Sequence, residues 1–178
     1  MPQKKIAASQ FSQDIQEFLH LLYKHEVKYV IVGEEAVIYY GHIRLTGDID
    51  IYYDRSQDNV EKLYQALKEF WGGTIPHLRQ SDGLTQKGLI TQFGLPPNRI
   101  DLVNEIEALE FSQAWKSKDT AYMQVSGESV SIHYIGLDLL IKNKMKVNRA
   151  RDVEDLRFLH AVKKYKRYGS FRSLMGTL

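Results

Sequence analysis

Acidic and apolar side chains alternate in Asp48-Ile49-Asp50-Ile51, and no other feature of the sequence constrains the fold as strongly. Successive side chains of a β-strand point to opposite faces, so both carboxylates lie on one face and both isoleucines on the other. Because the isoleucines need a hydrophobic core, the alternation places Asp48 and Asp50 on the accessible face. We therefore predict a strand over residues 48–53 with one buried and one open face.

Two carboxylates this close repel each other unless a cation or a proton lies between them. Carboxylate oxygens are the ligands that hard divalent ions prefer, and Mg²⁺ is the ion that best suits the pair. A third acid, Asp101, interrupts the apolar run 99–103, where a carboxylate is unexpected without a cation or an open face. The alternative is structural: Asp48 and Asp50 mark a strand edge at a turn, and Asp101 is an isolated polar position.

The rest of the sequence predicts helices where apolar residues recur at helical spacing, and strands where β-branched and aromatic residues gather. Expected helices cover residues 11–26, 34–40, 56–70, 137–147 and 152–165. Expected strands cover residues 28–32, 48–53, 89–93, 99–103, 122–125 and 130–134. This order predicts a mixed α/β (α+β) fold, with a small mixed central sheet flanked by helices and with C-terminal helices.

No repeat and no Pro/Gly/Ser-rich linker divides the 178 residues, so we expect one domain over residues 1–178. Its core is expected at about 28–135 and its basic C-terminal helices at about 136–168. The absence of cysteine excludes a disulfide scaffold, a thiolate metal site and a cysteine nucleophile. No apolar run reaches the ~18 residues of a membrane span, and the N-terminus lacks the apolar segment of a signal peptide. We expect a cytoplasmic protein that makes no contact with a membrane.

Positive charge is concentrated near the C-terminus. From Lys142 onward the chain has eleven Lys and Arg against three acids, whereas the preceding residues have thirteen against nineteen. A basic tail on an acidic body suggests contact with an anion, such as nucleotide phosphates, a polynucleotide or an acidic partner. The alternative is a solvated helix face. Within this tail, Asp152 and Asp155 lie on one helix face, and we expect them to pair with Arg149 or Arg151.

One stretch resembles a known family. Val32-Gly33, followed by Arg44-Leu45-Thr46-Gly47-Asp48-Ile49-Asp50, is similar to the strand, turn, short helix and Asp-x-Asp strand of the nucleotidyltransferase superfamily, whose fold is that of polymerase β. The closest resemblance is to small bacterial nucleotidyltransferases, including those of toxin–antitoxin and abortive-infection systems. Residues 137–144 and 149–156 resemble the C-terminal helices of that family.

The resemblance implies a metal-dependent enzyme that transfers a nucleoside monophosphate from a nucleoside triphosphate such as ATP to an acceptor hydroxyl, with release of pyrophosphate. Asp48, Asp50 and Asp101 would be the catalytic acids and would hold two Mg²⁺ ions, with Mn²⁺ as the alternative. Asp101 would also accept the proton of the hydroxyl. Nucleotide contacts would come from Gly33, Glu34, Arg44, Thr46, Lys144 and Arg149.

Glu34 departs from the family, which has Gly or Ser at this turn. A small residue lets phosphate oxygens approach backbone N–H groups, whereas Glu34 adds bulk and negative charge. A second hypothesis is therefore a catalytically impaired protein on the same fold, a toxin–antitoxin partner that binds RNA or protein. A third is a two-metal nuclease that uses the same acids. We favour the transferase, whose acceptor would be RNA, a protein or a small molecule, with a cognate toxin or antitoxin protein as a further partner.

Overall fold

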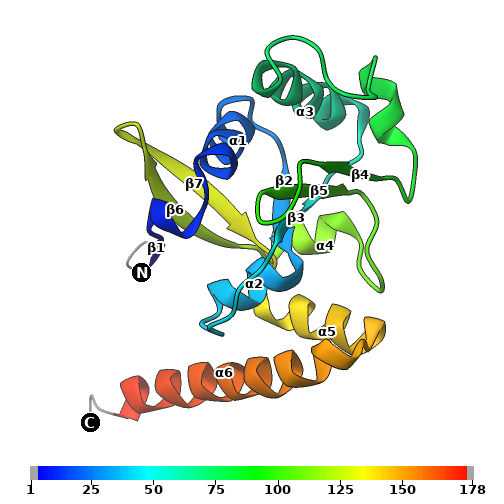
Figure 1. Ribbon diagram of the computed structural model, residues 1–178. Helices are drawn as coiled ribbons and strands as arrows, with labels where there is room; N and C mark the ends of the chain where they lie inside the picture. Colours follow the sequence, from blue (N-terminus) through cyan, green and yellow to red (C-terminus); the bar gives the residue numbers. More distant parts are fainter. Residues whose placement is uncertain (1–3, 176–178) are drawn as a thin grey trace.

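The structure is a computed structural model that describes residues 4–175, so the expected domain limits, residues 1 and 178, lie outside the described residues (Figure 1). The helices are α1 (Gln13–Lys24), α2 (Gly33–Tyr39), α3 (Gln57–Phe70), α4 (Phe111–Lys116), α5 (Leu137–Val147) and α6 (Ala150–Met175), with short 3₁₀ helices at Ala8–Gln10 and Ser81–Thr85. The strands are β1 (Lys4–Lys5), β2 (Tyr29–Val32), β3 (Asp48–Tyr53), β4 (Ile90–Phe93), β5 (Arg99–Val103), β6 (Asp119–Val125) and β7 (Glu128–Tyr134).

All seven strands form one sheet in the order β1-β6-β7-β2-β3-β5-β4. The pairs β1–β6, β7–β2 and β3–β5 are parallel, and the pairs β6–β7, β2–β3 and β5–β4 are antiparallel. The predicted mixed sheet flanked by helices is therefore confirmed. Strand β1 and helix α4 were not predicted, because two and six residues are too short to show a period.

The hydrophobic core lies around β2, all four residues of which are buried. Ser12 caps the start of helix α1, because its hydroxyl accepts a hydrogen bond from the Ile15 N–H at 3.4 Å. Helix α1 buries Phe18, Leu19 and Leu22 in this core. In Figure 1, α1 and α3 lie above the central strands, and α2, α5 and α6 lie below them.

The C-terminal helices α5 and α6 are joined by a tight turn in which Asn148 has a φ of 52°. This left-handed conformation ends α5, because asparagine tolerates it better than most residues. Helix α6 begins two residues earlier than predicted and extends ten residues further, to Met175. It crosses below α2 and α5 as one long rod (Figure 1). None of the helices between residues 4 and 175 is both long and apolar enough to span a lipid bilayer.

The register between β3 and β5 determines where the acids meet. The two strands run parallel, and Asp48 lies opposite Arg99 while Asp50 lies opposite Asp101. Side chains at paired positions share a face of the sheet. The pairing therefore places all three acids on one face, the face turned toward α5.

Candidate active site

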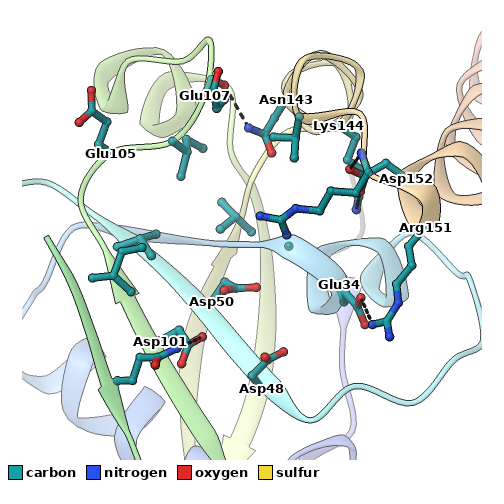
Figure 2. A pocket seen from close by; sticks show the side chains of 18 of the residues that line it. Glu34, Asp48, Asp50, Asp101, Glu105, Glu107, Asn143, Lys144, Arg151 and Asp152 are labelled. Carbon is teal, nitrogen blue, oxygen red and sulfur yellow. Dashed lines mark hydrogen bonds and ion pairs between the residues drawn. The ribbon is translucent and has the colours of Figure 1, made fainter. Parts of the chain in front are cut away.

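Asp48, Asp50 and Asp101 form the floor of a pocket of about 580 Å³. Figure 2 shows the three carboxylates on β3 and β5, below the side chains that come from the C-terminal helices. Ile49 and Ile51 point the other way and are 1% and 0% exposed, as the alternation predicts. The structure thus brings together the three acids that the sequence indicated.

Gly33 borders this floor and makes room for Asp50. It has a φ of 66°, a conformation that favours glycine, and a Cβ atom built on it would lie 2.0 Å from Asp50 Oδ2. Asp50 pairs with Val32, the residue before Gly33, so the backbone of β2 passes directly beside the carboxylate. A side chain at residue 33 would therefore displace Asp50.

Arg99 is the site residue that the sequence interpretation missed. Its Nε and Nη2 atoms donate to Asp101 Oδ1 and Oδ2 at 2.8 and 3.0 Å, and Nη2 also contacts Asp48 Oδ2. Gln92 Nε2 donates to Asp101 Oδ2 at 3.0 Å. The signal was present in the sequence, since Arg99 lies two residues before Asp101 on a predicted strand and so shares its face.

Asp50 has a different environment from its neighbours. Burial and the adjacent carboxylates of Asp48 and Asp101 raise the pKa of Asp50 to about 7. Among the hydrogen bonds of the described residues, none is donated to this carboxylate by a side chain. Asp50 is therefore the acid whose negative charge the site leaves least compensated.

Within the described part of the chain, no three His, Asp or Glu side chains are arranged as a ready metal site. The oxygens of Asp48 and Asp101 instead face the Arg99 guanidinium. The donor chemistry fits a hard divalent ion, because three carboxylates converge and one of them has a raised pKa. Asp48 and Asp50 are the residues that would hold the ion, together with Asp101 once Arg99 moves away.

The opposite wall of the pocket is basic and comes from the end of α5 and the start of α6. Lys144, Arg149 and Arg151 line it, together with Asp152. Lys144 is only 6% exposed, and its ammonium lies 3.0 Å from Asp152 Oδ1 and 2.7 Å from Asp155 Oδ2. The pocket therefore combines an acidic floor with a cationic wall (Figure 2).

The pairing predicted for Asp152 and Asp155 is wrong. Asp152 binds Lys144 and accepts a hydrogen bond from the backbone N–H of Arg149 at 2.8 Å, so it caps the start of α6. Asp155 is completely buried between Arg44 and Lys144. Helical spacing indicated Arg149 and Arg151 as partners, because they are close in the sequence. In the folded protein, Arg44 and Lys144 come from other elements and are more deeply buried.

The remaining predicted residues lie around or behind the pocket. The carboxylate of Glu34 lies on the pocket lining, 3.0 Å from Arg44 Nη2 and 3.4 Å from Arg151 Nη1. Arg44 itself and Thr46 are not among the lining residues. The Thr46 hydroxyl lies 3.0 Å from the backbone carbonyl of Asp48 and 3.2 Å from its carboxylate, so it supports the floor from behind.

Fold and pocket together define a nucleotidyltransferase-like α/β protein. The chain belongs to the family described as nucleotidyltransferase of unknown function (DUF6036), which matches residues 10–165. Its fold is similar to the crystal structure of a "putative nucleotidyltransferase" from Thermotoga maritima, with a TM-score of 0.53 and 14% sequence identity. That match covers 86% of this chain and 94% of the other. No curated protein matches the sequence.

Proposed function

We propose that the protein is a metal-dependent nucleotidyltransferase that transfers a nucleoside monophosphate from a nucleoside triphosphate to an acceptor hydroxyl and releases pyrophosphate. One observation carries the proposal: Asp48, Asp50 and Asp101 converge on a pocket whose opposite wall is cationic. A cation site beside basic side chains suits a polyphosphate, which needs both a divalent ion and positive charges around it. The family and the fold support the general class.

In this proposal each part of the pocket has its own task. When bound, Mg²⁺ neutralises the negative charge that develops on the phosphate oxygens. Asp48 and Asp50 hold it, and Gly33 keeps the space that Asp50 occupies. Arg149 and Arg151 lie at the exposed end of the wall, where they can contact phosphates. Lys144 orders the wall through its ion pairs with Asp152 and Asp155.

The direct test is label transfer. The protein is incubated with Mg²⁺ and each of the four α-labelled nucleoside triphosphates, in separate reactions with RNA, cell protein and small-molecule fractions as acceptors. We expect label in one acceptor class and pyrophosphate in solution. Asp50→Asn should abolish both. Asp58→Asn, which removes an 85% exposed carboxylate on α3 outside the pocket lining, should not. Phosphodiester cleavage without label transfer would instead support the nuclease hypothesis.

A second candidate function, binding of RNA without catalysis, is favoured by the solvent face of α6. Arg157, Lys164 and Arg167 are exposed on this face. At 3.6 residues per turn, they lie on the same side of the helix as Arg149, which lines the pocket. Among the ion pairs of the described residues, none involves these four side chains, whereas Lys163 and Lys166 on the flank pair with Asp138 and Asp119.

RNA binding is tested by titrating labelled single-stranded RNA at several salt concentrations. We expect the affinity to fall steeply with salt, because bound phosphates release counterions. Replacing Arg157 and Lys164 with glutamine should weaken binding and reduce the salt dependence. Replacing Lys62 and Lys87, two lysines outside α6, should change neither. Binding that persists together with failed label transfer would favour this second function over the first.

A further inference from the structure

The Arg99 guanidinium lies among the carboxylates of the acidic floor, where a cation is needed to offset their negative charge. Its guanidinium binds both oxygens of Asp101, and its Nη2 atom also reaches Asp48. The Asp101 carboxylate is 6% exposed and also accepts a hydrogen bond from Gln92. A planar, permanently charged guanidinium is well suited to this bidentate contact.

The arrangement reduces repulsion within the floor. Three carboxylates within one pocket destabilise each other, and one guanidinium between two of them offsets part of that cost. Asp50 does not share this contact, and its pKa is raised to about 7. Arg99 therefore compensates Asp48 and Asp101 in the protein without metal.

Arg99 and a divalent ion would compete for both oxygens of Asp101 and for Oδ2 of Asp48. A carboxylate that accepts two charge-assisted hydrogen bonds in its plane has few lone pairs left for a metal. A metal ion that uses Asp48 and Asp101 must first displace Arg99, and the loss of those contacts weakens the apparent affinity of the metal.

We propose that Arg99 is a built-in competitor of the metal: its side chain occupies Asp48 and Asp101 in the resting protein and must leave both before a divalent ion is held by all three acids. Asp101 can then act on the substrate hydroxyl only in the metal-loaded state. Arg99 lines the same pocket as Arg149 and Arg151. This inference rests on the proposed metal-dependent function.

The test measures binding of Mn²⁺ alone by the loss of its free-ion EPR signal, without nucleotide and without turnover. Arg99→Gln should bind Mn²⁺ on the order of tenfold more tightly than the unchanged protein, because one competing positive charge is removed. Arg99→Lys keeps the charge but loses the bidentate contact, and its affinity should lie between the two. Arg79→Gln removes a positive charge from an exposed position outside the pocket and should leave the affinity unchanged.

Equal or weaker Mn²⁺ binding by Arg99→Gln would overturn the inference while leaving the metal site itself in place. Absence of saturable binding in all four proteins would overturn the proposed metal dependence as well. If Arg99→Gln does not fold, the unchanged protein gives the answer by NMR of arginine side chains. Mg²⁺ should then shift the Arg99 Nε–Hε resonance, identified by its absence in Arg99→Lys, and a resonance that Mg²⁺ does not move would count against competition.

Discussion

At the scale of single residues, Gly33 and Asp50 depend on each other. The carboxylate of Asp50 fills the space where a side chain on residue 33 would begin. The acid itself is half-buried beside two other carboxylates. A turn glycine at this position thus does more than allow a sharp change of chain direction, because it admits a charged group into the floor of the pocket.

Gly33→Ala should cost more stability than the conformational penalty alone. Gly72→Ala is the matched control, since Gly72 has a φ of 63° and no atom lies within 4 Å of its added Cβ. We expect Gly72→Ala to lower the free energy of unfolding by about 1 kcal/mol. Gly33→Ala should exceed that by at least about 1 kcal/mol because Asp50 must move. Equal losses in urea denaturation would contradict the proposed packing role.

Asp50 should make the metal-free protein less stable as pH rises. Its pKa is about 7 in the folded protein and close to 4 in the unfolded chain, so the folded state binds more protons between these values. The free energy of unfolding then falls with pH across this window. Asp50→Asn removes this contribution, and its stability relative to the unchanged protein should increase from pH 4 to pH 7.

Other groups titrate in the same range, so the pH dependence is best measured as that difference. Burial raises the pKa of Glu35 to about 7, and burial lowers the pKa of His133 to about 4. Both groups are present in the unchanged protein and in Asp50→Asn, so their contributions to the free energy of unfolding cancel in the difference between the two proteins. A difference that stays flat from pH 4 to pH 7 in chelator-treated samples would show that Asp50 is already ionised there.

At the scale of elements, α5 and α6 are fixed to the rest of the protein by buried ion pairs. Lys144 of α5 contacts Asp152 and Asp155 of α6, and Asp155 also contacts Arg44 in the loop before β3. His42 in the same loop stacks on Phe158 of α6 with ring centroids 4.7 Å apart. The cationic wall of the pocket is thus attached to the strand that carries the acids.

Asp155→Asn should destabilise this attachment strongly. The substitution removes the buried carboxylate that Arg44 and Lys144 share, and leaves Arg44 with the partly exposed Glu34 and Lys144 with Asp152. Breaking a buried ion pair typically costs about 3–5 kcal/mol. Glu154→Gln, one position earlier on an 81% exposed side chain, should change stability by less than about 0.5 kcal/mol. Thermal unfolding of the two variants checks the prediction, and similar melting temperatures would refute it.

Helices and strands in which apolar residues recur regularly could be predicted from the sequence. The ion pairs that attach α5 and α6 could not. The strand at 48–53 matches its predicted limits because acidic and apolar residues alternate along it. The contact between Arg44 and Asp155 joins residues 111 positions apart, and only the packing of α6 against the loop brings them together. Helix α6 was predicted too short because, taken over its whole length, it has almost no amphipathic period that would mark its end.

At the scale of the whole molecule, Glu34 joins its own helix to the loop before β3 and to the distant helix α6. It lies on α2 and contacts Arg44 before β3. It also contacts Arg151 on α6 (Figure 2). The expected conflict between Glu34 and phosphates is therefore reduced, because two guanidinium groups already compensate its charge. The three acids could be predicted from their spacing, but this compensation depends on the tertiary arrangement.

Glu34→Ser should tighten nucleotide binding by about three- to tenfold, or about 0.7–1.4 kcal/mol. The substitution removes one negative charge from the pocket lining and releases Arg151 toward the phosphates. Calorimetry with ATP and Mg²⁺ measures the change. Glu107→Ser removes an equal charge elsewhere on the lining and serves as the comparison. The same gain in both variants would assign the effect to the overall charge of the pocket rather than to Glu34.

The acidic floor and the cationic wall of the pocket are also synthesised at different times. All three acids lie before residue 102, whereas Lys144, Arg149 and Arg151 belong to the last two helices. Because a chain emerges from the ribosome N-terminus first, the acidic floor is exposed before its cationic wall has been made. A nascent chain that has reached only β7 therefore carries the three carboxylates of the floor and none of these cations. In the proposed function, the pocket can therefore hold a triphosphate only after the last two helices have been made.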